Sequence, residues 1–218
     1  MRSIGLFSMF VFSAGGLVGA PALPHSVTPE TALKMLMAGN QRYVAGHTLH
    51  PNQSKERQLE VEAGQAPFAV VLGCADSRVP PEVIFDQGLG DLFVIRVAGN
   101  VVDNEITASM EYAVEHLGAS LIMVLGHEKC GAVTASVKGG EVPGHLPSII
   151  GHMRIAVEEA KVMPGDAVSN CVRLNVQYVV RELRDSEPIL RELVKAGTVK
   201  IIGARYDLHT GKVIPVED

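Results

Sequence analysis

The sequence has 218 residues, of which 47% are hydrophobic and 20% are charged, as is ordinary for one packed globular domain. The net charge of −5, with no cluster of Lys and Arg, argues against a surface that binds nucleic acid. No linker, long repeat or low-complexity tract divides the chain, so we predict a single domain over residues 23–218.

The first residues differ from the rest of the chain. Arg2 precedes an apolar run over residues 4–18, and Ala20-Pro21-Ala22 follows as an A-x-A-like motif. This order is typical of a secretory signal peptide. We therefore predict a signal peptide over residues 1–22, cleavage after Ala22, a periplasmic or secreted protein, and no stable membrane span after processing. The alternatives are an uncleaved N-terminus or a membrane tether.

The pattern of the next segment predicts a helix that forms an N-terminal arm of the domain. Thr28 suits the N-cap and Pro29 suits the first helical position, and Leu36 and Tyr43 lie among apolar residues at roughly helical spacing. The apolar face of this helix needs a surface to cover, either in its own subunit or in a partner. Residues 46–66 are polar and predict a loop that leads into the core.

Strands and helices alternate through the remainder of the chain. Residues 68–73 form a continuous apolar run, which favours a strand buried on both faces, as in a parallel sheet. Further strands are predicted over residues 91–98, 120–126, 199–204 and 211–216, and helices over residues 104–117, from residue 131, and, two or three in number, within residues 147–195. This alternation predicts an α/β fold in which helices flank a central, mostly parallel β-sheet.

Two of the predicted strands end in side chains that bind soft metals. Cys74 and His127 each follow a Gly at a strand end, and Cys130 lies three residues after His127. Ligands of open α/β sheets lie at the carboxyl ends of the strands, and two Cys with one His suit zinc, which prefers four tetrahedral donors. We predict a zinc ion bound by these three residues, with Cys171 as a buried thiol.

An acidic and a basic side chain follow the first Cys at alternate positions. Asp76 and Arg78 share one face if the segment is extended. The fourth position on the metal is then water, substrate or Asp76. We predict that Asp76 accepts a hydrogen bond from zinc-bound hydroxide, and that Arg78 holds Asp76 off the metal in an ion pair. Release by Arg78 would let Asp76 close the site, which is a hypothetical off switch.

Three segments carry a resemblance to a known family. CADSRVPPE, GDLFVIRVAGN and GHEKCGA, which begin at residues 74, 90 and 126, resemble the signature blocks of the β-class carbonic anhydrases. The resemblance extends from about residue 28 to the C-terminus. It implies a zinc lyase that hydrates carbon dioxide reversibly to bicarbonate and a proton, four parallel strands with a fifth at the edge, and homodimers that can pair into tetramers.

The resemblance also assigns roles by position. Cys74, His127 and Cys130 match the zinc ligands, and Asp76 and Arg78 match the catalytic dyad of the family. In one branch of the family a glutamine at the position of Gln65 reaches bicarbonate from the neighbouring subunit, and the positions of Phe93 and Tyr112 line the substrate pocket; plain core roles for these two aromatic residues are the alternative. The allosteric branch has a Trp at the position of Val71, although Arg96 is kept, so the match favours the plant-like, open-site branch.

Other functions are also compatible with the sequence. A hydrolase of carbonyl sulfide or carbon disulfide would use the same scaffold, and a non-catalytic protein would use zinc only to hold its fold. A thiol redox protein is disfavoured because the chain lacks a Cys-x-x-Cys motif. Hydration must also export a proton, and the sequence does not choose a relay among His116, His145 and His152.

Overall fold

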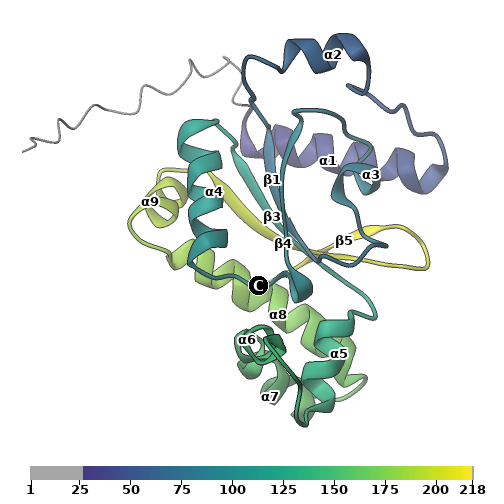
Figure 1. Ribbon diagram of the computed structural model, residues 1–218, viewed down its shortest axis with the longest axis vertical. Coiled ribbons are helices and arrows are strands. Elements are labelled where there is room, and N and C mark those ends of the chain that lie inside the picture. Colours follow the sequence, from purple (N-terminus) through teal and green to yellow (C-terminus); the bar gives the residue numbers. More distant parts are fainter. Residues whose placement is uncertain (1–26, 218) are drawn as a thin grey trace, which may run out of the picture.

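A five-stranded sheet forms the centre of the molecule in a computed structural model that describes residues 27–217 (Figure 1). The order across the sheet is β2-β1-β3-β4-β5; the first four strands are parallel, and β5 pairs with β4 antiparallel. The strands are β1 (Ala69–Gly73), β2 (Leu92–Arg96), β3 (Leu121–His127), β4 (Lys200–Tyr206) and β5 (Val213–Val216). The predicted α/β fold is confirmed. The predicted signal peptide lies outside the described residues.

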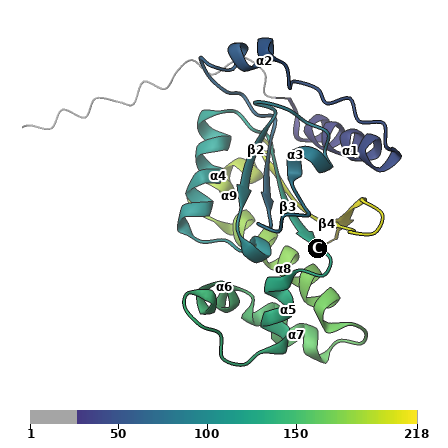
Figure 2. The same ribbon diagram turned by 45° about the vertical axis from the view of Figure 1, so that its right-hand side comes forward.

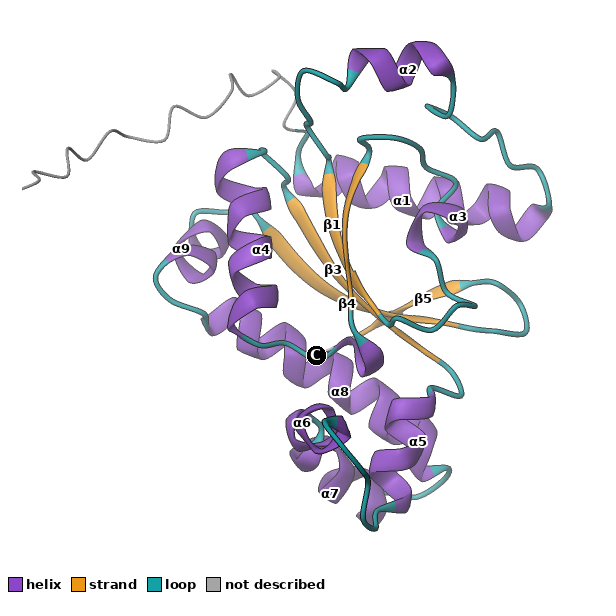
Figure 3. Cartoon of the chain, in the orientation of Figure 1, coloured by secondary structure: helices purple, strands orange, loops and turns teal. Residues whose placement is uncertain are grey.

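Helices cover both faces of this sheet (Figure 3). They are α1 (Pro29–Ala45), α2 (Lys55–Glu60), α3 (Pro81–Ile84), α4 (Asn104–His116), α5 (Gly131–Lys138), α6 (Leu146–His152), α7 (Arg154–Val162), α8 (Ala167–Asp185) and α9 (Ile189–Lys195), with a 3-10 turn, η1, at Ala98–Asn100. Helices α1 and α3 lie on one face, and α4 and α9 on the other. Helices α5, α6 and α7 form a lobe beyond the carboxyl ends of the strands (Figure 2).

Strand β1 is buried along its whole length. Its side chains alternate between two apolar cores, with Val71 in the core on the α1 side and Val70 and Leu72 in the core on the α4 side. A strand that contributes to two cores needs apolar residues at every position. This is why the sequence shows a continuous run rather than alternation.

Helix α1 covers a surface of its own subunit. Thr28 caps it by accepting a hydrogen bond from the backbone N–H of Thr31, and Leu36 is fully buried against the sheet. The buried amide of Asn40 donates to the carbonyls of Ile84 and Gly211, which ties α1 to α3 and to the loop before β5. The apolar face of the helix is therefore used within one chain.

Two local predictions were wrong. Residues 46–66 contain helix α2, which Ser54 caps through the backbone N–H of Arg57, and which has no buried residue. Because α2 presents no apolar stripe, hydrophobic periodicity does not reveal it. Residues 146–195 form four helices rather than two or three, and Pro164 and Pro188 lie at two of the breaks between them.

Helix α8 approaches the sheet closely near the end of β3 and at the middle of β4. A Cβ atom added at Gly126 or at Gly203 would lie 2.6 Å from the Val176 side chain, so only Gly at both positions lets this helix pack so near. The approach brings the middle of α8 beside the carboxyl ends of the strands. Among the described residues, none of the helices has both the length and the apolarity that crossing a membrane requires.

Candidate metal centre

The carboxyl ends of β1 and β3 bring three potential metal donors together. Cys74 directly follows β1, His127 is the last residue of β3, and Cys130 precedes the first turn of α5. The strands are parallel neighbours with Gly73 opposite Leu125, so both chains reach the same edge at the same level. The fold therefore brings Cys74, His127 and Cys130 together, as predicted.

The distances among these donors suit a single ion. The Sγ atoms of Cys74 and Cys130 lie 4.0 Å apart, and the three donor atoms lie within 4.8 Å of one another. A tetrahedral zinc ion with Zn–S distances of about 2.3 Å separates two sulfurs by about 3.8 Å. All three side chains are buried. The geometry therefore fits zinc with little adjustment.

The imidazole of His127 is oriented for a metal. Its Nδ1 lies 2.9 Å from the carbonyl oxygen of Glu128, so Nδ1 carries the proton and Nε2 presents its lone pair. The buried Nε2 has no hydrogen-bond partner among residues 27–217. A buried nitrogen without a partner is costly, and a metal ion beside the two sulfurs would satisfy it. The residues present thus fit a zinc ion.

The two thiols differ in acidity. The hydrogen bond from the Cys130 thiol lowers the pKa of Cys74, with further help from His127 and from the backbone N–H of Gly99, which lies 3.3 Å from the sulfur. The same thiol–thiol contact raises the pKa of Cys130. The first thiolate of the pair therefore forms at Cys74. Cys130 is at the N-cap of α5, where the helix dipole favours a negative charge, so this position also suits a thiolate once a metal ion binds.

Asp76 and Arg78 form a bidentate pair beside the donors. Arg78 donates from Nε to Oδ1 at 2.9 Å and from Nη2 to Oδ2 at 2.7 Å, and its backbone N–H also bonds Oδ1 at 3.0 Å. The hydrogen bonds from Arg78 hold the pKa of Asp76 well below its usual range. The Oδ2 atom of Asp76 lies 3.9 Å from Nε2 of His127. An ionised carboxylate is thus held next to the donors.

Arg96 braces the segment that carries Cys74 and Asp76. From the end of β2, its Nε donates to the carbonyl of Cys74 at 2.9 Å and its Nη2 to the carbonyl of Asp76 at 2.5 Å. Sequence reasoning did not give Arg96 this role. The signal that could have indicated it is a charged residue at the end of an apolar strand, one strand away from the first donor.

The predicted substrate residues lie elsewhere in the same chain. Phe93 contacts Tyr112 with ring centroids 6.4 Å apart, and Phe93 pairs with Val70 near the start of β1. Gln65 is exposed and precedes β1, whereas Cys74 follows it. At ~3.3 Å per residue, that five-residue strand separates them by roughly 16 Å. One chain therefore does not bring Gln65, Phe93 and Tyr112 to its own metal donors.

The three candidate proton relays are exposed. The ring of His116 contacts that of Tyr112, with centroids 5.4 Å apart, at the far end of α4 from η1. His145 directly precedes α6, and His152 ends that helix in the lobe. None of the three contacts the donors of the metal centre through a hydrogen bond, ion pair or ring contact in the described part of the chain, and the relay stays an open prediction.

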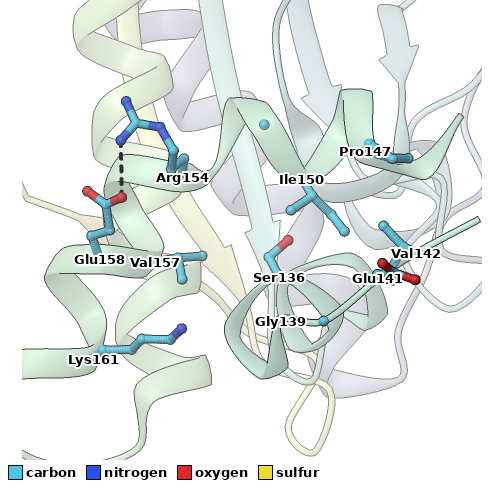
Figure 4. A pocket seen from close by; sticks show the side chains of 12 residues that line it. Ser136, Gly139, Glu141, Val142, Pro147, Ile150, Arg154, Val157, Glu158 and Lys161 are labelled. Carbon is cyan, nitrogen blue, oxygen red and sulfur yellow. Dashed lines mark hydrogen bonds and ion pairs between the residues drawn. The ribbon is translucent and has the colours of Figure 1, made fainter.

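A hollow of about 660 Å³ in the α5–α7 lobe is separate from the metal centre (Figure 4). Val142, Ile150 and Val157 form apolar parts of its lining, and Arg154 pairs with Glu158 beside it at 3.0 Å. None of its described lining residues is a Cys or a His, so it offers no soft metal donor. The chemistry of this chain belongs to the strand ends instead.

Comparisons with known proteins show the family of this chain. The carbonic anhydrase family matches residues 69–213. A carbonic anhydrase of Mycolicibacterium smegmatis is 42% identical over 195 residues, covering 88% of this chain and 94% of that protein. A tetrameric β-carbonic anhydrase of Sordaria macrospora has a TM-score of 0.69 at 27% identity, covering 86% of this chain and 98% of that one. A Coccomyxa β-carbonic anhydrase in complex with acetazolamide has a TM-score of 0.66 at 28% identity, covering 86% and 82%.

Proposed function

Since the chain belongs to the β class of carbonic anhydrases, zinc-dependent enzymes that hydrate carbon dioxide reversibly to bicarbonate and a proton, we propose that Cys74, His127 and Cys130 hold its zinc ion. The observation that carries this assignment is the buried Nε2 of His127, which has no partner among the described residues and faces two sulfurs. When bound, zinc supplies Lewis acidity that brings the pKa of a water molecule near neutrality.

Asp76 is the residue that orients the reacting water. Its carboxylate lies 3.9 Å from Nε2 of His127 and stays ionised at neutral pH because Arg78 donates to both of its oxygens. An ionised carboxylate accepts a hydrogen bond from the water and fixes the direction of its lone pair toward carbon dioxide. Arg78 keeps Asp76 in this position.

The same ion pair supports the open-site branch. Asp76 is engaged twice by the Arg78 side chain, and Arg78 also donates to the carbonyl of Lys129 at 3.3 Å, in the turn between His127 and Cys130. Asp76 is thus held as a partner of Arg78 rather than as a fourth metal ligand. The buried Val71, at the position where the allosteric branch has a Trp, agrees with this assignment.

The functional unit in this proposal is a homo-oligomer, at least a dimer. Strand β2 is the edge of the sheet, and its four apolar residues are only partly buried. Phe93 lies on this strand and contacts Tyr112, and the exposed Gln65 precedes the neighbouring strand β1, at the end opposite to Cys74. A partner that meets this edge would receive these residues at its own site, where Gln65 steadies the developing carboxylate. The tetrameric Sordaria relative supports such an assembly.

The alternative substrates are disfavoured by the relatives described above, which are named carbonic anhydrases.

The direct test of the proposed function is the variant Asp76→Asn, measured by zinc content and by stopped-flow hydration of carbon dioxide. We expect full zinc and a fall in kcat/KM of roughly 100-fold, since general-base positioning contributes about that much. Hydration at the parent rate would remove Asp76 from the reaction. Faster turnover of carbonyl sulfide than of carbon dioxide by the parent would overturn the substrate.

We also propose export, on the basis of the sequence of residues 1–22 alone. In an oxidising compartment, zinc would protect the Cys74 and Cys130 thiolates from oxidation. N-terminal sequencing of the mature protein tests this. We expect the first residue to be Leu23, and a mature chain that retains residues 1–22 would contradict it.

A further inference from the structure

The sulfur of Cys74 accepts a hydrogen bond from the protein backbone. The donor is the N–H of Gly99, whose nitrogen lies 3.3 Å from Sγ. A thiolate that binds zinc donates part of its own negative charge to the ion. Two thiolates therefore reduce the ability of the ion to lower the pKa of a bound water molecule. A hydrogen bond to the sulfur draws charge away from the metal. The Gly99 N–H is therefore placed to influence the acidity of the bound ion.

The aim of this N–H depends on an unusual backbone turn. Gly99 lies in η1 with a φ of 74°, in the left-handed region that favours glycine. A Cβ atom at this position would lie 3.3 Å from Met153 and 3.4 Å from Ala132, so the turn is also closely surrounded. Gly99 has no side chain with which to fix its own orientation. Its carbonyl, however, accepts a hydrogen bond from a side chain of α8.

A single buried side chain holds that carbonyl. The amide nitrogen of Asn175, on α8, donates to the carbonyl oxygen of Gly99 at 2.9 Å, and Asn175 is only 2% exposed. The next residue, Val176, fits between Gly126 and Gly203, where either added Cβ would meet it at 2.6 Å. Because α8 is seated there against β3 and β4, Asn175 cannot shift along the sheet. The chain of contacts runs from α8 through η1 to the metal-binding sulfur.

We propose that Asn175 is a positioning residue for the zinc reaction, acting through the Gly99 turn on the Cys74 thiolate. This inference rests on the proposed zinc ligands. Asn175 holds the Gly99 carbonyl, the turn aims the Gly99 N–H at Sγ, and the hydrogen bond limits the charge that Cys74 passes to the ion. Asn175 touches neither substrate nor metal. Its contribution is to let a zinc ion with two thiolate ligands still lower the pKa of its bound water enough for the reaction.

The test replaces Asn175 with Leu, which has a similar size and no donor. The variant and the parent are loaded with cobalt(II), and the sulfur-to-metal charge-transfer band is recorded. Zinc release to a chelator and the pH midpoint of kcat/KM are measured in parallel. We expect a shifted band, zinc release roughly 10- to 100-fold faster, as for other residues that support metal ligands, and a pH midpoint that moves upward. If Asn175→Leu does not fold, Asn175→Ser, whose side chain is too short to reach Gly99, is tested in the same way.

Asn40 provides the matched control. It is 3% exposed, and its amide also donates to backbone carbonyls, those of Ile84 and Gly211, but it lies on α1. Asn40→Leu should lose comparable stability and leave the cobalt band and the pH midpoint unchanged. An unchanged band in the Asn175 variants, or an equal change in Asn40→Leu, would overturn the inference. Absence of a charge-transfer band in the parent would overturn the zinc ligands instead.

Discussion

Strands β1 and β2 are neighbours of equal length and similar apolar sequence, yet they have different surroundings. Every residue of β1 is buried, whereas the four apolar residues of β2 are partly exposed at the edge of the sheet. β1 leads into Cys74, where the metal donors, Asp76 and Arg78 are joined by a dense set of hydrogen bonds. Beside β2, Tyr112 is 48% exposed, and its ring contacts those of Phe93 and His116.

This contrast divides the enzyme into two halves. The metal-binding half is complete within one chain and sits on fully buried strands. The proposed substrate-binding half comprises Gln65, Phe93 and Tyr112. Phe93 lies on the edge strand β2, whose apolar residues are partly exposed, and its ring contacts that of Tyr112. Exposed edge strands are readily paired by another chain. The predictions that follow test each half in turn, from the largest expected effect to the smallest.

Loss of a metal donor should have the largest effect. In Cys130→Ser we expect little bound zinc and a fall in kcat/KM of roughly a thousand-fold or more, because water without the metal is a far weaker nucleophile at neutral pH. Zinc analysis and stopped-flow hydration measure both. Cys171→Ser is the matched control. Burial raises the pKa of the Cys171 thiol to about 11, and Cys171 is not one of the three clustered donors. Equal zinc loss in both variants would contradict the assignment.

A charge on the exposed strand should separate the subunits. Val94 lies in the middle of β2, and Val94→Lys should give a monomer, because charged side chains on edge strands oppose pairing. Zinc should be retained, while kcat/KM falls by roughly 100-fold as the site loses the partner's contribution. Sedimentation and metal analysis test this. Val162→Lys, on the exposed face of α7, should change neither. An oligomeric and active Val94→Lys variant would place the interface elsewhere.

Removal of the Arg96 brace should have a smaller effect on the metal half. In Arg96→Gln we expect zinc release to a chelator to be about 10-fold faster, because the carbonyls of Cys74 and Asp76 lose charged donors. Arg154→Gln, which breaks an exposed pair with Glu158, should leave zinc release unchanged. If both variants released zinc at the parent rate, Arg96 would not brace the centre.

The smallest effect concerns the half-exposed aromatic residue. Tyr112→Leu should change the free energy of unfolding by no more than about 0.5 kcal/mol, as for other exposed positions, while KM for carbon dioxide rises about three-fold as one wall of the pocket recedes. Denaturant unfolding and steady-state kinetics separate the two effects. A loss above about 2 kcal/mol with unchanged KM would make Tyr112 a core residue.

The metal half was predictable from sequence because its signal is local. The continuous apolar run before Cys74 and the run before His127 indicate parallel buried strands, and parallel strands bring their carboxyl ends together. The roles of Arg96 and Asn175 were not predictable in this way. Both donate to backbone carbonyls, and the sequence does not show which carbonyl a side chain will reach. Asn175 is buried beside Val176, which packs against two glycines that are distant in the sequence.

The sequence pattern also did not reveal helix α2, or that residues 146–195 form four helices rather than two or three. Helix α2 has no buried face, so it forms through its Ser54 cap and local hydrogen bonds rather than through an apolar stripe. In the proposed oligomer, the substrate half depends on the partner's chain. The sequence placed Gln65, Phe93 and Tyr112 through family resemblance, whereas their separation from Cys74 by the length of β1 emerges only from the fold.

The central claim is that each active site joins the metal half of one chain to the substrate half of another. Co-expression of Asp76→Asn and Gln65→Ala subunits with different tags, followed by isolation of the doubly tagged oligomer, tests it directly. In such a dimer one of the two sites has both residues intact, so we expect about half of the parent hydration rate, well above either variant alone. A rate no higher than the mean of the two variants would contradict the claim.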